Sequence, residues 1–298
     1  MTPASPEPSS PRIGVVPYLN MLPFTHGLEA LRGAGGERPV IVSVPPSRMT
    51  DLMARGELDL GMIPTGGLIE HPAWRIVGRS MIGSEGPVWS VLVFGLGEPS
   101  TWVRLRPDSH SRTSNYLARM ILARRSGFLP RLEAPIPSDG WRLPADPKSA
   151  EAFVLIGARA LKSRSGWEAL GGTVMDLGQA WEEWTGLPFV YAVWVARPDV
   201  ELGDWPDRLD DLKRRNLERL DQLAAAWPGL AEEGLTPGQA LQYLRERIRF
   251  DLTPRALQGL KRFHDEGLAL RLFDEGWDMS ASLGTALEEH RAGGQSGV

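Results

Sequence analysis

The sequence contains no cysteine among its 298 residues. This excludes disulfides, thiolate catalysis, iron–sulfur clusters and cysteine-based zinc sites together. Histidine is scarce as well, and no two occurrences stand three or four residues apart, the spacing that presents two ligands on one helix face. The five histidines are His26, His71, His110, His264 and His290. We therefore expect no histidine-rich metal site.

A surplus of positive charge is also missing. The 33 Lys and Arg residues are outnumbered by 37 Asp and Glu residues, which gives a formal net charge of −4 and a pI of about 5.8. A general nucleic-acid binder needs a basic face to displace the counterions of the phosphates. We therefore expect no nucleic-acid partner.

Long hydrophobic runs are absent too. No segment approaches the roughly 20 apolar residues of a membrane span, so we expect no membrane partner. Residues 1–11 are rich in proline and serine and lack the basic start and the apolar stretch of about 7–15 residues of a secretory signal. We expect these eleven residues to form a disordered tail and the protein to be cytoplasmic.

Strand-like and helix-like patterns alternate through the first two thirds of the chain. Strands are predicted at 12–16, 40–44, 59–63, 74–82, 88–94, 102–105, 152–156 and 188–196, and helices between Ser47 and Gly56, at 113–125 and at 178–185. The alternation predicts the α/β class, with a parallel sheet covered by helices on both faces. The almost wholly apolar segment 188–196 is predicted to be buried on both faces.

From Trp205 onward the patterns predict helices only. These cover 207–226, 237–250 and 254–266, each with leucines on one side, and the glycine-rich tail after His290 is expected to fray.

The length allows two domains of ordinary size. The two most apolar strands, at 88–95 and 188–196, are candidates for the crossings between two such units. We expect one lobe to comprise 12–91 and 196–298 and the other to comprise 92–195. Clefts between lobes are preferred ligand sites, so we expect the ligand there.

A cluster of hydroxyl groups stands at the start of the predicted helix 113–125. Ser111, Thr113 and Ser114 lie where the first backbone N–H groups are unpaired and the helix dipole is positive. Such a helix start binds a carboxylate or phosphate well. A hydroxyl that only caps the helix explains the same residues, and both interpretations stay open. Arg112 is expected to pair with a neighbouring acid.

Two further polar residues adjoin apolar strands. Asn20 follows the first strand and can offer a ligand both a donor and an acceptor, although a turn residue fits equally. Ser90 lies inside an apolar strand, where a buried hydroxyl needs a partner that the neighbouring backbone can also supply. His110 is expected to be a loop residue and not a general base.

Common nucleotide-binding and hydrolase motifs are missing. The turn at 83–87 has no following lysine, and the Gly-Leu-Gly at 95–97 lacks the third glycine of a dinucleotide fingerprint. No Gly-x-Ser-x-Gly elbow occurs. The residues alone indicate a two-lobed α/β protein that binds a small anion, and they leave open whether it also reacts.

Six motifs, in the same order along the chain, resemble the chorismate dehydratases of the futalosine route to menaquinone. They are Tyr-Leu-Asn-x-x-Pro at 18–23, Gly-Glu-Leu-Asp-Leu-Gly at 56–61, Gly-Ser-x-Gly-Pro-Val-x-Ser-Val at 83–91, Ser-Arg-Thr-Ser-x-x-Leu at 111–117, Val-Leu-Ile-Gly at 154–157 and Asp-Leu-Gly-x-x-Trp-x-x-Trp-Thr-Gly-Leu-Pro-Phe-Val at 176–190. The resemblance spans about residues 12–270, and the last motif is long and specific.

The resemblance implies the two-lobed fold of type II periplasmic solute-binding proteins. It also implies a lyase that removes water from chorismate to give 3-[(1-carboxyvinyl)oxy]benzoate, with no metal and no organic cofactor. Asn20 and Ser90 match the family's active-site residues and are expected to be catalytic. The residues expected to bind the substrate are Ser111, Thr113, Ser114 and Thr65.

The resemblance further implies that the enolpyruvyl carboxylate of the substrate is itself the base. The protein then needs only to hold that carboxylate near the proton it removes. Two segments depart from the family pattern. Gly66-Gly67 stand in a segment where the family often carries glutamate, and Ala158-Arg159 stand where it usually carries aspartate.

Two other functions fit the same fold. One is a cytoplasmic binding protein that closes on a small carboxylate without reacting. The other is the sister enzyme of the pathway, 1,4-dihydroxy-6-naphthoate synthase. The Tyr-Leu-Asn and Thr-Gly-Leu-Pro-Phe segments favour the dehydratase over this enzyme.

Overall fold

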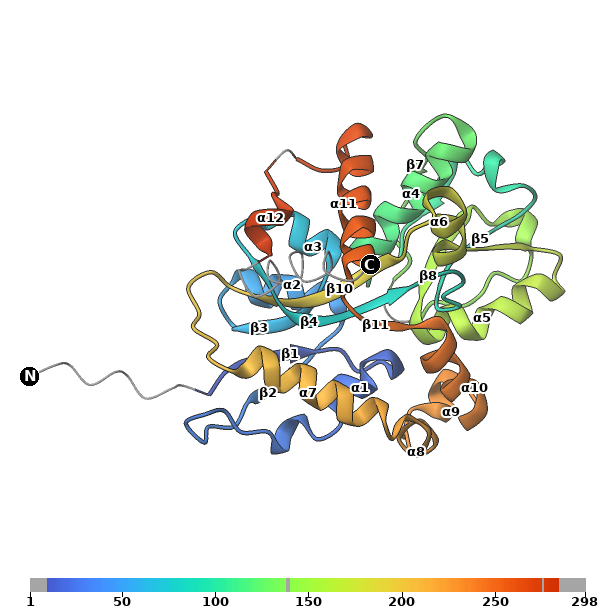
Figure 1. Cartoon of the computed structure of the whole chain (residues 1–298). Coiled ribbons are helices and arrows are strands. Elements are labelled where there is room, and N and C mark those ends of the chain that lie inside the picture. Colours follow the sequence, from blue (N-terminus) through green and yellow to red (C-terminus); the bar gives the residue numbers. More distant parts are fainter. Residues whose placement is uncertain (1–9, 138–139, 275, 284–298) are drawn as a thin grey trace, which may run out of the picture.

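Two β-sheets organise the chain (Figure 1). The computed structural model describes residues 10–137, 140–274 and 276–283. The first sheet has the order β11-β4-β10-β3-β1-β2, with β1 Arg12–Val15, β2 Val40–Ser43, β3 Leu60–Pro64, β4 Arg75–Ser84, β10 Phe189–Ala196 and β11 Arg249–Asp251. The second has the order β7-β6-β8-β5-β9, with β5 Val91–Gly95, β6 Arg104–Arg106, β7 Arg131–Leu132, β8 Ala152–Ile156 and β9 Thr173–Asp176.

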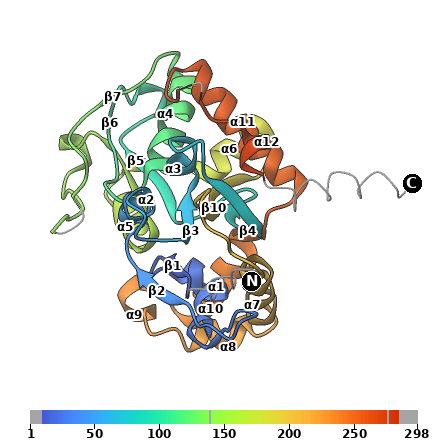
Figure 2. The ribbon, with the colours of Figure 1, turned by 90° about the vertical axis from the view of Figure 1, so that its left-hand side faces the viewer.

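Helices cover both faces of the six-stranded sheet. The α-helices are α1 Leu22–Thr25, α2 Pro46–Ala54, α3 Thr65–Ile69, α4 Arg112–Ser126, α5 Gly157–Ala169, α6 Leu177–Thr185, α7 Trp205–Leu217, α8 Leu220–Ala225, α9 Leu230–Glu233, α10 Pro237–Gln242, α11 Pro254–Ala269 and α12 Met279–Ser282. In Figures 1 and 2, α11 lies above the strands β4 and β10 of this sheet and α7 lies below them. The predicted α/β class is confirmed.

The prediction of a parallel sheet was wrong, because both sheets are mixed. In the first sheet β1 runs parallel to β2 and β3, while β10 runs antiparallel to β3 and β4. The register pairs Phe189 with Ser84, the residue at which β4 ends. β10 therefore starts beside the point where β4 leaves for the second sheet. A strand that returns at that point has to run in the opposite direction.

The strand β10 also bears on the expected lobe boundary. It pairs with β4 from Phe189 to Ala196 and with β3 from Ala192 to Ala196, so the chain re-enters the first sheet before residue 195. We propose that each sheet with its helices forms one lobe and that the chain crosses between them at 85–90 and 186–188. Residues 1–9 of the expected tail, and those after His290, lie outside the described residues.

The C-terminal third departs from the expected run of helices. The predicted helix 207–226 is divided into α7 and α8, and the predicted helix 237–250 is replaced by α10, a π-helical turn at Tyr243–Arg247, and β11. β11 adds an antiparallel strand to the free side of β4. Its Phe250 packs edge-on against Phe24 in the core, with the ring centroids 5.7 Å apart. Pairing with a distant strand thus overrides the local helical pattern.

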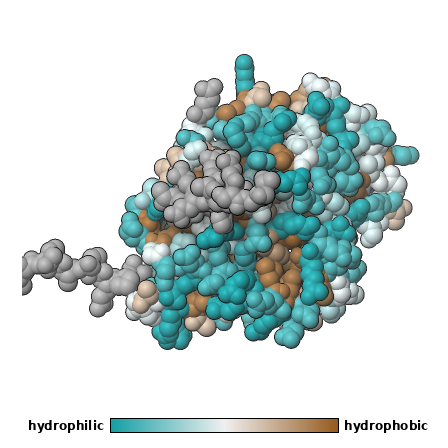
Figure 3. Space-filling model, viewed as in Figure 1, coloured by the Kyte–Doolittle hydropathy of each residue, from teal (hydrophilic) through white to brown (hydrophobic). Residues whose placement is uncertain are grey.

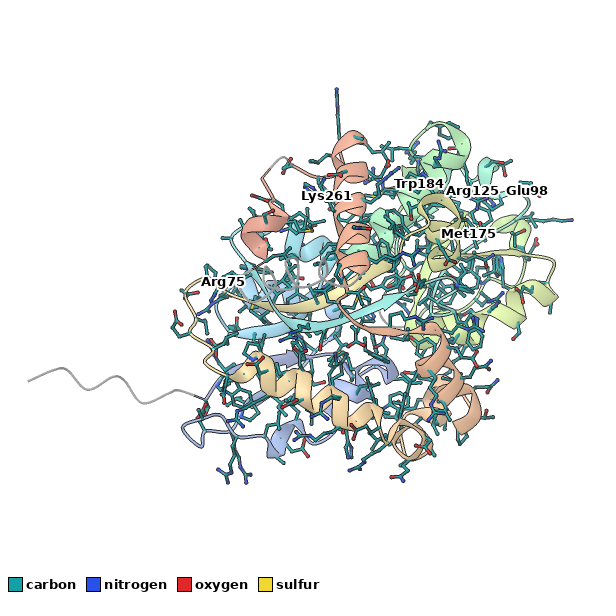
Figure 4. All side chains as sticks on the ribbon, in the orientation of Figure 1. Arg75, Glu98, Arg125, Met175, Trp184 and Lys261 are labelled. Atoms are coloured by element: carbon teal, nitrogen blue, oxygen red, sulfur yellow. The ribbon has the colours of Figure 1, made fainter. Side chains whose placement is uncertain are left out.

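The helix α4 shows how local sequence positions one wall of the second lobe. Ser111 caps its start, and Gly127 ends it in the left-handed conformation with φ of 85°. On its inward face, Leu117, Met120 and Ile121 are all buried. α6 lies beside α4, as Figure 4 shows where Arg125 and Trp184 are labelled at the same end of the two helices.

The outer surface is polar over most of the face in Figure 3, with smaller hydrophobic areas between the hydrophilic ones. Among the described residues, no helix combines the length and the apolar composition that crossing a membrane requires.

The contact between α11 and the second crossing provides a test of the packing. A Cβ atom on Gly259 would lie 2.0 Å from the carbonyl oxygen of Pro188, whereas one on Gly238 of α10 meets nothing within 4 Å. We expect Gly259→Ala to lower the free energy of unfolding by about 1–3 kcal/mol through this clash. The matched change Gly238→Ala should be neutral or stabilise by up to about 1 kcal/mol. Denaturant titration measures both, and equal effects would contradict the packing described.

Candidate functional site

A pocket lies between the two sheets, and its walls come from both. The cavity itself measures about 80 Å³, and about 650 Å³ of space lies between its walls when the open mouth is included. The residues that line it are Val16, Tyr18, Asn20, Pro46, Met62, Pro64, Ile82, Val88, Ser90, Val91, Ser111, Thr113, Ser114, Ile156, Gly157, Tyr191, Ala192 and Ile248. None of these described lining residues carries a charged side chain, so the polar groups of the pocket are hydroxyls, one amide and backbone.

The structure brings five of the six predicted site residues to this pocket. Asn20 comes from the turn after β1 and Ser90 from the first crossing, while the other three stand at the start of α4: Ser111, Thr113 and Ser114. They are far apart in sequence and meet because both sheets end at the pocket. The alternatives to a ligand role for each residue can now be compared with its actual partners.

Thr65 is the predicted site residue that does not line the pocket. Its side chain is fully buried, and its hydroxyl donates to the carbonyl oxygen of Val190 at 2.7 Å. The hydroxyl therefore fastens the start of α3 to β10. We do not retain Thr65 as a substrate-binding residue.

Two of the hydroxyls at the start of α4 satisfy each other. The Ser111 oxygen accepts from the backbone N–H of Ser114 at 3.1 Å, and its own hydroxyl donates to the Ser114 oxygen at 2.8 Å. The capping interpretation is therefore correct for Ser111. The Ser114 hydroxyl proton is not used in this pair, and both residues line the pocket. A cap and a ligand contact are compatible here.

The third hydroxyl of this helix start joins the two lobes. The Thr113 oxygen accepts from the backbone N–H of Gly66 at 2.9 Å. A Cβ atom on Gly66 would lie 3.2 Å from the Thr113 backbone nitrogen, and one on Gly67 would lie 2.5 Å from the Thr50 oxygen. The two glycines that depart from the family pattern thus allow α3 to approach both α2 and α4 closely.

Arg112 lies outside the pocket lining. Its guanidinium pairs with Asp51 at 3.1 Å and also with Glu70, which agrees with the predicted structural role.

Ser90 sits in a segment that one carboxylate holds in place. Asp176 accepts from the backbone N–H groups of Val88 and Trp89 at 2.8–3.1 Å, and from two N–H groups at the start of α6. Burial raises the pKa of Asp176, and these four N–H groups act in the opposite direction. Trp89 has φ of 65°, a conformation that is costly for a bulky residue. The hydrogen bonds of Asp176 and the packing of neighbouring side chains hold Trp89 in this conformation.

The Ser90 hydroxyl has a side-chain partner. It lies 2.8 Å from the Tyr243 hydroxyl, and both residues are buried. The suggestion that neighbouring backbone would satisfy this serine was therefore wrong for the hydroxyl. Tyr243 belongs to the π-helical turn of the C-terminal region.

The second departure from the family pattern also has a structural explanation. Arg159, at the start of α5, donates to Asp108 at 2.6 Å, and the Asp108 side chain is fully buried. Burial raises the pKa of Asp108, whereas Arg159 lowers it. The same carboxylate accepts from the backbone N–H groups of His110 and Ile156. Asp108 thus orders the loop before α4 next to the pocket, and His110 is a loop residue as predicted.

A buried carboxylate lies beneath the turn that carries Asn20. Glu233, at the end of α9, accepts a hydrogen bond from the backbone N–H of Leu19, and its side chain is buried. Burial raises the pKa of Glu233 to about 7, while the Leu19 N–H and Lys162 lower it and Glu232 raises it. The position of Asn20 therefore depends partly on a group that titrates near neutrality.

Sequence reasoning missed several residues that support the site. Asp176 opens the longest motif, and a position between a strand and a helix marks it as an N-cap. Tyr18 lies in the first motif and lines the pocket, and burial raises its pKa to about 12. Tyr243 and Glu233 belong to no motif. Their partners, Ser90 and Leu19, lie more than 150 positions earlier, and no local pattern in the sequence indicates these contacts.

Comparison with known proteins places the sequence in one family. A family model described as menaquinone biosynthesis matches residues 11–267. A chorismate dehydratase from Thermus thermophilus is 27% identical over 271 residues, which cover 84% of this chain and 93% of that protein.

Solved structures share the architecture at low sequence identity. A protein from Archaeoglobus fulgidus superposes with a TM-score of 0.68 at 14% identity and covers 89% of this chain and 98% of its own. The alkanesulfonate-binding protein of Xanthomonas axonopodis pv. citri, bound to MOPS, gives a TM-score of 0.62 at 13% identity, covering 94% and 99%. The periplasmic-binding-protein-like fold expected from the sequence is thereby confirmed.

The buried carboxylate of Glu233 yields a prediction about pH. Its pKa is higher in the folded chain than in the unfolded chain, so folding binds a proton between the two values. Its contribution to stability is present at low pH and is lost as the pH rises through about 7. Glu233→Gln keeps an acceptor for the Leu19 N–H but does not titrate. Relative to this variant, we expect the wild type to lose stability between about pH 5 and about pH 8.

Denaturant midpoints across that pH range measure the difference. Glu218→Gln is the control, because among the residues that the structure describes the Glu218 side chain pairs only with Arg214, both being exposed, and such pairs contribute about 0–1 kcal/mol. Parallel pH profiles for the wild type and Glu233→Gln would refute the assignment.

Proposed function

Because the chain belongs to the menaquinone biosynthesis family, whose model covers most of its length, we propose that it is a chorismate dehydratase. In this proposal the protein is a lyase that removes water from chorismate and releases 3-[(1-carboxyvinyl)oxy]benzoate. The observation that carries the proposal is the uncharged, hydroxyl-lined pocket that unites Asn20 and Ser90 with the start of α4. The relative from Thermus thermophilus supports the same reaction.

The pocket suits a substrate that carries its own base. Chorismate is a dianion with a ring carboxylate and an enolpyruvyl carboxylate. Hydroxyl groups and a helix start stabilise such groups by hydrogen bonds. A neutral lining offers the carboxylates hydroxyl donors and no paired cation, and a cation beside the reacting carboxylate would lower its basicity.

The reaction breaks one C–H bond and one C–O bond of the ring. The C–H bond breaks at the ring carbon that carries the enolpyruvyl ether, and its electron pair enters the ring. The C–O bond to the adjacent ring hydroxyl breaks, and that hydroxyl leaves with the abstracted proton as water. Aromatisation of the ring supplies much of the driving force. The enolpyruvyl carboxylate takes the proton and passes it to the departing hydroxide, so the protein contributes orientation.

Asn20, in the turn after β1, and Ser90, in the first crossing, would provide that orientation. The Ser90 hydroxyl donates to the enolpyruvyl carboxylate and holds it against the C–H bond. The Oδ1 atom of Asn20 is buried and has no hydrogen-bond partner among the described residues. An unpaired buried acceptor is costly, and the ring hydroxyl of chorismate is the donor that would satisfy it.

Turnover of chorismate tests the proposal. Purified protein should convert chorismate into an aromatic product lighter by one water, followed by absorbance and mass spectrometry. Ser90→Ala should lower kcat about 100-fold, because one oriented hydrogen bond to the reacting group is lost. Asn20→Ala should also lower it.

The control for these variants is Ser126→Ala, since within the described part of the chain the Ser126 hydroxyl bonds only to the Leu122 carbonyl of α4 and to Phe128 just beyond the helix. It should keep the activity of the wild type. Chorismate that binds in calorimetry but is recovered unchanged would identify a binding protein instead. Turnover of cyclic dehypoxanthine futalosine would identify the naphthoate synthase.

A further inference from the structure

The Tyr243 hydroxyl stands between the two residues proposed to orient the substrate. It lies 2.8 Å from the Ser90 oxygen, and the side chain of Asn20 also forms a hydrogen bond with it. Tyr243 is almost fully buried and is not itself part of the pocket lining. It therefore contacts Asn20 and Ser90 from behind, on the side away from the ligand space.

The turn that carries Tyr243 holds the Ser90 segment at two points. Its five residues, Tyr243–Arg247, form a π-helix, a form that occurs mostly as short segments and frequently at functional sites. The guanidinium of Arg247 lies 4.3 Å from the centroid of the Trp89 ring, a distance at which cation–π attraction is significant. The turn thus fixes Trp89 and Ser90 together, while Asp176 fixes the backbone before them.

The number of hydrogen-bond donors among Ser90, Asn20 and Tyr243 determines which group donates to which. Burial raises the pKa of Tyr243, so the phenol is neutral. Its hydrogen bonds with Ser90 and Asn20 lower that pKa by less. When the Asn20 amide donates to the phenol oxygen, the phenol proton is directed to the Ser90 oxygen. A phenol is also a stronger acid than an aliphatic hydroxyl and hence the better donor. The Ser90 proton then has no acceptor in the network and is directed into the pocket.

We propose that Tyr243 is a positioning residue that makes Ser90 a hydrogen-bond donor to the substrate carboxylate. The inference rests on the proposed function, since it presumes that a carboxylate faces Ser90 during the reaction. Without the phenol, the Ser90 hydroxyl can turn back toward Asn20 or rotate freely. The substrate carboxylate then loses a donor of fixed direction, although every residue of the pocket lining is still present.

Tyr243→Phe removes the hydroxyl and keeps the ring in the core. We expect kcat on chorismate to fall about 10- to 100-fold through lost orientation, with a smaller change in KM. Tyr116→Phe is the matched control, because its phenol donates to Glu70 at 2.9 Å outside the pocket. It should keep the wild-type kcat. Thermal unfolding of both variants checks that the fold is intact.

A double-mutant cycle with Ser90→Ala distinguishes positioning from a general structural effect. If Tyr243 acts through Ser90, adding Tyr243→Phe to Ser90→Ala should change kcat less than about twofold. A wild-type kcat in Tyr243→Phe, or a full further loss in the Ser90→Ala background, would overturn the inference while the proposed function stands. A wild type that does not convert chorismate would remove the proposed function, and the inference with it.

Discussion

The carboxylate of Asp176 is the interaction on which the rest of the site depends. It accepts four backbone N–H groups, two from the first crossing and two from the start of α6. The crossing and the helix would otherwise each leave buried donors unpaired, at about 1–3 kcal/mol per group. A Cβ atom on Gly178 would lie 2.6 Å from the Gly86 carbonyl oxygen, so the approach also requires a glycine. The hydrogen bonds of Asp176 to the first crossing therefore fix the position of Ser90.

The buried charged groups around the pocket do not line it; they hold in place the segments that do. Asp108 and Arg159 order the loop before α4, Asp176 orders the crossing, and Glu233 supports the turn of Asn20. The pocket itself is lined, within the described residues, by neutral side chains. Ionic groups thus supply rigidity, and neutral donors meet the ligand. In the proposed reaction, the carboxylate that abstracts the proton is then not paired with a cation, which would lower its basicity.

Local structure and the grouping of the site could be predicted from the sequence, whereas long-range pairing could not. The limits of α4 follow from its capping residues Ser111 and Gly127, which act within one turn. The direction of β10 depends on where the chain re-enters the sheet, and β11 replaces a plausible helical pattern because the side of β4 is free. The partner of Ser90 lies 153 residues away, and neither hydroxyl marks the other in the sequence. The periodicity of a segment carries no information about such a partner.

The late position of β11 and the π-turn has a consequence for synthesis. The ribosome delivers both sheets, except for this last strand, before Tyr243 and Arg249 emerge. Until then the nascent chain can bury most of its core, yet the Ser90 hydroxyl has no phenol beside it and β4 has an open edge. If Tyr243 acts as proposed, the ligand site is therefore completed late in synthesis, shortly before α11 follows and covers the first sheet. A chain that ended before Tyr243 would lack β11, α11 and the phenol beside Ser90 together.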